Sequence, residues 1–131
     1  MAGMKLDSAG VNKLKTLDEA LLLLQRIHGL VEQYSMSLKR NQPTQALLMN
    51  IRRQLPTLAA NLKNQFGMIS DQVTAVNLAA SRGASEAVRL RGMREGVAQV
   101  KQAIEIAMTQ TKDKHKVVEE KHSAADTSDG A

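Results

Sequence analysis

Apolar residues recur every seven positions through the middle of this chain. Two neighbouring rows fall on one stripe of a helix: Leu48, Leu55, Leu62, Ile69 and Val76, and beside them Ile51, Leu58, Phe66, Val73 and Ala80. The stripe passes Pro56 and Gly67 without losing phase, so it predicts one long helix from the residues after Pro43 to about Ala80, kinked at Pro56. At about 1.5 Å per residue this helix would span roughly 50–55 Å, which requires other long helices to cover it.

Similar rows predict one further helix on each side of this segment. The inward rows are Leu17, Leu24, Val31 and Leu38 with Ala20, Ile27 and Tyr34 in the first helix, and Leu90, Val97, Ile104 and Val118 with Met93, Val100 and Ala107 in the third. A capping-box pattern at residues 16–19 predicts the start of the first helix, although Val11 and Leu14 allow an earlier one. Residues 41–43 and 81–85 form the two breaks, and Ser85 suits the cap of the third helix.

Three long helices joined by two short breaks predict an all-α fold, an elongated antiparallel coiled-coil-like bundle. We expect a flexible N-terminal arm over residues 1–10, the three-helix domain over 11–122 and a disordered C-terminal tail over 123–131. The first helix is about a dozen residues shorter than the others, and it should leave part of the apolar stripe open to a partner. The candidate protein-interaction residues are Ile69, Val73, Val76, Ala80 and Leu90. The alternative is a self-contained bundle with frayed ends.

The formal net charge of +5 is unevenly distributed, because no acidic residue lies between Glu32 and Asp71. Basic residues of this kind can contact phosphates, anionic lipids or acidic proteins, or can form an ordinary solvated helix face. Tyr34 and Phe66 fall in the apolar rows, which leaves no aromatic platform for bases, so we expect no specific nucleic-acid recognition. The candidate basic face consists of Arg52, Arg53, Lys63, Arg89, Arg91 and Arg94.

No pattern of residues predicts catalysis, a cofactor or a metal. The chain has no cysteine, and although His115, Glu119 and His122 share a helix face, no second set of ligands accompanies them. Gly92 and Gly96 are spaced for close approach to a neighbouring helix. The longest apolar run, Ala20–Leu24, is far too short to span a bilayer, and the first residues lack the pattern of a signal peptide. We therefore expect a soluble, cytoplasmic protein that is not an enzyme.

Three stretches of this sequence resemble a known family. Residues 41–47, Asn-Gln-Pro-Thr-x-Ala-Leu, and residues 52–59, Arg-Arg-Gln-Leu-Pro-Thr-Leu-Ala, resemble the Asn-x-Pro-Ser turn and Arg-Arg-Ser-Leu-Pro-x-Leu-Ala helix of subunit eight of BORC, the BLOC-one-related complex. Residues 100–106, which follow Arg94, are similar to a Lys-Gln-Ala-Ile-Ser-Ile segment near the end of the same family. The resemblance covers roughly residues 35–107.

The resemblance implies a non-enzymatic subunit of a multi-chain helical scaffold on the cytosolic face of lysosomes. Such a scaffold recruits an Arf-like small GTPase and couples the organelle to kinesin transport. The expected partners are other coiled-coil subunits of a hetero-oligomer, with peripheral membrane association through the complex. Two other interpretations are a basic helical protein that binds anionic membrane or nucleic acid through its charged face, and a bacterial secretion or flagellar chaperone. High salt distinguishes an apolar seam from phosphate contacts, which weaken steeply with ionic strength.

Overall fold

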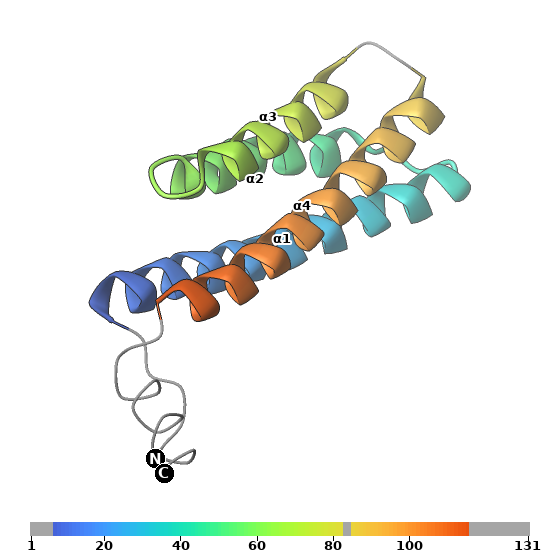
Figure 1. Ribbon diagram of the computed structural model, residues 1–131. Helices are drawn as coiled ribbons and strands as arrows, with labels where there is room; N and C mark the ends of the chain where they lie inside the picture. The colour runs from blue at the N-terminus through green and yellow to red at the C-terminus, as the bar shows by residue number, and fades with distance from the viewer. Residues whose placement is uncertain (1–6, 83–84, 116–131) are drawn as a thin grey trace, which may run out of the picture.

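The computed structural model describes residues 7–82 and 85–115 of the chain. This part is all-helical and consists of α1 (Ser8–Lys39), α2 (Gln45–Leu62), α3 (Gly67–Ser81) and α4 (Glu86–Lys114). Helix α1 packs against α2 and α4, and α3 packs against the same two helices, so the four form an antiparallel ring. In Figure 1, α1 and α4 form a long pair, while α2 and α3 form a shorter hairpin over part of it.

The interior of this bundle is formed by the predicted apolar rows. Leu24, Ile27 and Val31 of α1 are almost fully buried, as are Leu55 and Leu58 of α2. Each helix therefore contributes one apolar stripe to a shared core, as its seven-residue spacing predicts. The all-α class is confirmed.

The predicted number of helices is wrong, because the single central helix is two helices. The chain reverses direction at residues 63–66, where Phe66 has φ −138° and ψ 63° and no helical geometry. Asn64 and Gly67 are poor helix formers, and residues 63–65 are exposed, so little favours a continuous helix there. The reversal lets Ser70 Oγ donate to the carbonyl oxygen of Ala59 at 2.8 Å. Helix α2 continues through the exposed Pro56, and the kink predicted there is not confirmed.

The start of α1 also differs from the prediction. Ser8, Ala9 and Gly10 are helical, although the sequence predicted an arm over residues 1–10. The Asp7 carboxylate caps the helix by accepting from the Gly10 N–H at 2.7 Å. Thr16 is no cap, because its hydroxyl donates to the Asn12 carbonyl oxygen within the helix at 3.1 Å. The tail predicted at 123–131 and the row member Val118 lie outside the described residues.

Two local predictions are confirmed. Ser85 caps α4, since its hydroxyl oxygen accepts from the Val88 N–H at 3.2 Å. Gly92 and Gly96 mark the close approach of α4 to α3: a Cβ on Gly92 would lie 3.2 Å from the Cβ of Ala79, and one on Gly96 would collide with the Val76 side chain. These glycines set the spacing between the hairpin and the long pair.

Candidate interaction surfaces

The residues predicted to form an open seam lie in the core. Ile69, Val73, Val76 and Ala80 are at most 8% exposed, and Leu90 is partly buried against them. The prediction assumed three helices, one of which was too short to reach this stripe. With four helices, α2 and α4 flank α3 on both sides, and the chain covers the stripe itself.

Polar contacts tie the helices together at one end, which we call the closed end. The Tyr34 hydroxyl of α1 accepts from Arg89 Nη1 of α4 at 3.3 Å, although Tyr34 itself is fully buried. The Thr44 hydroxyl, just before α2, donates to the Glu86 carboxylate of α4 at 3.1 Å. Arg89 also donates to the carbonyl oxygen of Arg82, which follows α3, at 2.9 Å. These contacts link all four helices.

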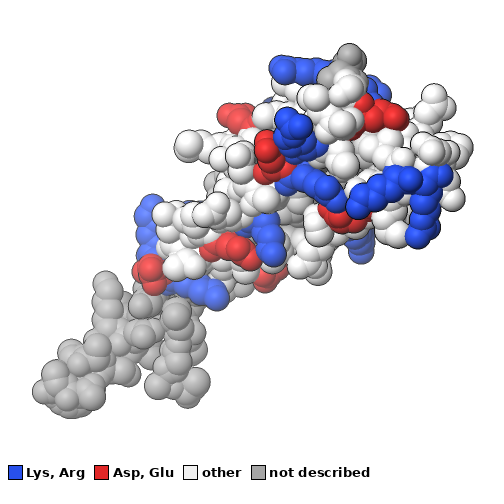
Figure 2. All heavy atoms as spheres, turned by 90° about the vertical axis from the view of Figure 1, so that its right-hand side faces the viewer, with Lys and Arg blue, Asp and Glu red and all other residues white. Residues whose placement is uncertain are grey.

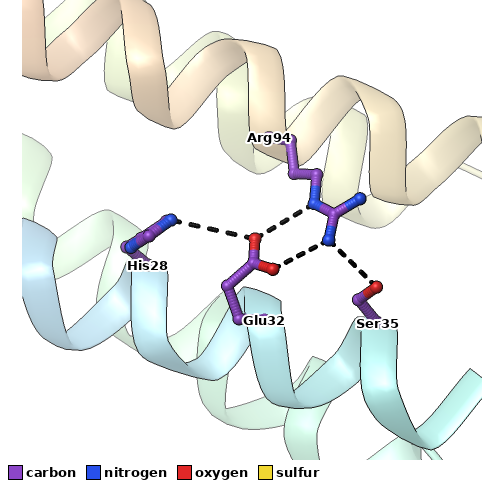
Figure 3. Close-up of polar contacts among 4 residues, drawn as sticks. All are labelled: His28, Glu32, Ser35 and Arg94. Carbon is purple, nitrogen blue, oxygen red and sulfur yellow. Dashed lines mark hydrogen bonds and ion pairs between the residues drawn. The ribbon is translucent and has the colours of Figure 1, made fainter.

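Arg94 forms a bidentate ion pair across α1 and α4. Its Nε and Nη2 donate to the two carboxylate oxygens of Glu32 at 3.0 and 2.7 Å, and Nη2 also donates to Ser35 Oγ at 3.0 Å. Figure 3 shows this arrangement, with His28 3.7 Å from the same carboxylate. The hydrogen bonds from Arg94 lower the pKa of Glu32 below its ordinary value of 4.5, and Glu32 raises the pKa of Arg94. This pair fixes the register of the long helices.

The six candidate basic residues therefore do not act as one face. Arg89 and Arg94 hold α1 and α4 together, whereas Arg52 and Arg53 lie on the outer side of the hairpin. There they line a shallow hollow with Met49, Asn77 and Ser81. Lys63 lies at the hairpin tip and Arg91 is exposed on α4. Figure 2, which looks onto the closed end, shows basic side chains interspersed with acidic ones.

Three exposed apolar residues lie along the solvent face of α1, interspersed with the exposed polar residues Lys15, Asp18, Gln25 and Gln33. Val11 is 54% exposed, Leu22 60% and Met36 48%. Leu22 and Met36 are fourteen residues apart with Gly29 midway, and Val11 precedes Leu22 by eleven, so all four project in nearly the same direction. We call this set the α1 outer line. This set was not predicted from the sequence, although Leu22, Gly29 and Met36 follow one another at seven-residue steps.

A groove lies at the other end of the bundle, which we call the open end. Its volume is about 490 Å³, and it separates the start of α3 from the last turns of α4. Phe66, Met68 and Ile69 form one wall. Ala103, Ile106 and Ala107 of α4 form the other. Met68 is 82% exposed and Ile106 49%, so the rim presents apolar side chains beside the exposed Gln65, Gln72 and Gln110.

The beginning of α1 and the end of α4 are joined beside this groove. The Asp7 N–H donates to the His115 carbonyl oxygen at 3.2 Å, and His115 Nδ1 lies 3.1 Å from Asp7 Oδ1. The Gly10 N–H, and after it His115, lowers the pKa of Asp7. Lys13 Nζ lies 3.3 Å from His115 Nε2. At the open end, the start of α1 is thus joined to the end of α4, and the groove lies beside this junction.

Within residues 7–82 and 85–115, no group of three His, Cys, Asp or Glu side chains could hold a metal ion. His122 and Glu119, considered with His115, lie outside these residues. None of the described helices is both long and apolar enough to cross a membrane. Comparisons with family models, curated proteins and solved structures gave no match.

Proposed function

We propose that this chain is a non-enzymatic helical subunit of a multi-protein scaffold, and that other helices pack along its surface. The observation that supports this proposal best is the α1 outer line. Single exposed apolar side chains are normal on soluble proteins. A series on one helix face is different, because α1 already packs against α2 and α4 on its inner side.

The outer line suits a partner helix in dimensions and chemistry. From Val11 to Met36 it covers about 38 Å at 1.5 Å per residue, enough for several heptads of a coiled coil. Gly29 lies between Leu22 and Met36, and a Cβ there would meet nothing within 4 Å. A partner backbone could therefore approach α1 closely at this point. Among the described residues, we find no arrangement of side chains that suggests a catalytic site.

The more specific form of the proposal comes from the resemblance to subunit eight of BORC. In that form the chain is a scaffold subunit on the cytosolic face of lysosomes, where its complex positions the organelle for transport. The Arg-Arg-Gln-Leu-Pro-Thr-Leu-Ala segment of the resemblance, residues 52–59, lies within α2. Its leucines Leu55 and Leu58 face the core while Arg52 and Arg53 stay exposed, which is consistent with a structural role for the apolar members of that motif.

Purification of the full chain from its native cells tests this function. The wild type should retain helical partners in about 1 M salt, since an apolar contact is not screened as charges are. Leu22→Asp combined with Met36→Asp should abolish this association while the isolated chain stays helical by circular dichroism. Gln102→Asp on the exposed side of α4 is the control. Partners that remain bound to the double variant would overturn the proposal.

A second candidate function is the binding of anionic membrane or nucleic acid through the hairpin. Arg52, Arg53 and Lys63 support it, because they are exposed in a stretch without acidic residues. Arg52→Glu combined with Arg53→Glu should then abolish association, and salt should weaken it steeply. Under the scaffold proposal the same double variant has little effect.

A further inference from the structure

The open end exists because the hairpin is shorter than the pair that it covers. Helices α2 and α3 have 18 and 15 residues, whereas α1 and α4 have 32 and 29. The hairpin begins at the closed end, so its tip stops beside Ala103 and Ala107 of α4. Beyond this tip, no third or fourth helix among residues 7–82 and 85–115 covers the inner sides of α1 and α4.

The inward rows of both long helices end on lysine at this place. In α1 the row Tyr34, Ile27, Ala20 continues seven residues earlier with Lys13. In α4 the row Met93, Val100, Ala107 continues seven residues later with Lys114. Both lysines line the groove. Two ammonium groups therefore lie in rows that are otherwise formed by Ala20, Ile27 and Tyr34 and by Met93, Val100 and Ala107.

The groove provides no carboxylate for these lysines. None of its lining residues is Asp or Glu. The nearby Asp7 accepts from the Gly10 N–H and lies beside His115 and Lys13, which both contribute to lowering its pKa. Asp113, although next to Lys114 in sequence, does not line the groove. Amphipathic helices bury their apolar side and present charges at its edges. A partly apolar groove that is edged by two lysines and lined by no carboxylate thus fits a helix with acidic edges.

We propose that the open-end groove binds an amphipathic helix of a partner protein, with carboxylates that pair with Lys13 and Lys114. The helix lies between the start of α3 and the end of α4 and extends the bundle beyond the hairpin tip. Its apolar side contacts Phe66, Met68 and Ile106. This inference rests on the proposed function in that the occupant belongs to a protein partner, but it uses a different surface from the α1 outer line.

Fluorescence anisotropy with a designed peptide pair tests this inference. One labelled peptide has three heptads with a Leu and Ala side flanked by Glu, and its twin has Lys at every Glu position. The full chain should bind the acidic peptide, and Lys13→Glu with Lys114→Glu should weaken that binding by about tenfold or more and confer binding of the basic twin. Lys15→Glu with Lys101→Glu, the same charge change outside the groove, should leave both results unchanged.

Three results would overturn the inference. The first is that the wild type binds neither peptide or binds both equally. The second is that the control pair of substitutions acts as strongly as the groove pair. The third is that only a chain ending at His115 binds the acidic peptide, which would assign the groove to the chain's own residues 116–131. If the groove variants have no effect while Leu22→Asp with Met36→Asp still abolishes co-purification, the groove inference alone fails and the proposed function stands.

Discussion

The two ends of the bundle differ in how completely the four helices enclose the core and bond to one another. At the closed end four helices enclose a core, and Tyr34, Thr44 and Arg89 join them by hydrogen bonds. At the open end two long helices continue past the hairpin, and the inward positions become small, polar or basic. The closed end thus joins all four helices by polar contacts, whereas the open-end groove and the outer side of α1 leave apolar side chains exposed.

The comparison predicts very different costs for truncating apolar residues in the two regions. Ile51→Ala, at a fully buried position of α2, should lower the free energy of unfolding by about 2–5 kcal/mol. Met68→Ala, on the rim of the groove, should change it by less than about 0.5 kcal/mol. Urea denaturation of the full chain measures both. Equal losses would mean that the open end is as well packed as the closed end.

Pro56 offers a gain in stability within the hairpin. It lies inside α2 and is exposed, and a proline there removes one backbone hydrogen bond and crowds the preceding turn. Pro56→Ala should raise the free energy of unfolding by about 1–3 kcal/mol. A clear loss, measured by thermal or urea unfolding, would show that the proline is needed to shape or start this helix.

Two glycines distinguish a packed helix contact from an open one. Gly96→Ala should destabilise the bundle by about 1–2 kcal/mol, because the added Cβ collides with the stiff Val76 side chain. Gly29→Ala should stabilise it by up to about 1 kcal/mol, since α1 is open there. Val76→Ala in the Gly96→Ala background should recover part of the loss. If both alanines stabilise the protein, the close approach of α3 and α4 is wrong.

A small effect is expected from the pH dependence of the Glu32–Arg94 pair. The folded-state pKa of Glu32 is lowered, so its contribution to stability is present above the ordinary value of 4.5 and disappears as pH falls through the lowered value. Both side chains are almost half exposed, so we expect about 0.5–1 kcal/mol. Wild type and Glu32→Gln should differ by that amount at neutral pH and converge in acid. An unchanged difference in acid would exclude this titration as the cause.

The inward residues could be predicted from the sequence, but the path of the chain could not. Of the central rows, Leu48 and Phe66 are half-buried and the other members are buried. Seven-residue spacing reports rotation about a helix axis, and it is silent on whether the axis reverses. Leu62 and Ile69 keep their spacing across the turn because both helices face the same core. The turn itself was signalled only by the polar residues 63–65 and Gly67.

The interaction surfaces were harder to predict because they depend on which helix covers the apolar side of which other helix. The seam around Val76 seemed open only while the hairpin was counted as a single helix. To predict the open-end groove, one must know where the hairpin tip at residues 63–66 meets α4. This meeting is a tertiary contact between segments that are distant in the sequence. Leu22 was readable in principle. In the run 20–24, Ala20 and Leu24 face inward, which leaves Leu22 outward.

Hydrogen exchange of the isolated chain and of the complex that we propose tests the contrast between the two ends most directly. In the isolated chain, amides of residues 103–115 and 63–69 should exchange faster than those of 45–58 and 86–97, because the open end is less enclosed. In the complex, α1 and the open end should become slower, while the closed end changes little. The account is contradicted if the complex protects the hairpin around Arg52 and Arg53 and leaves α1 and the open end unchanged.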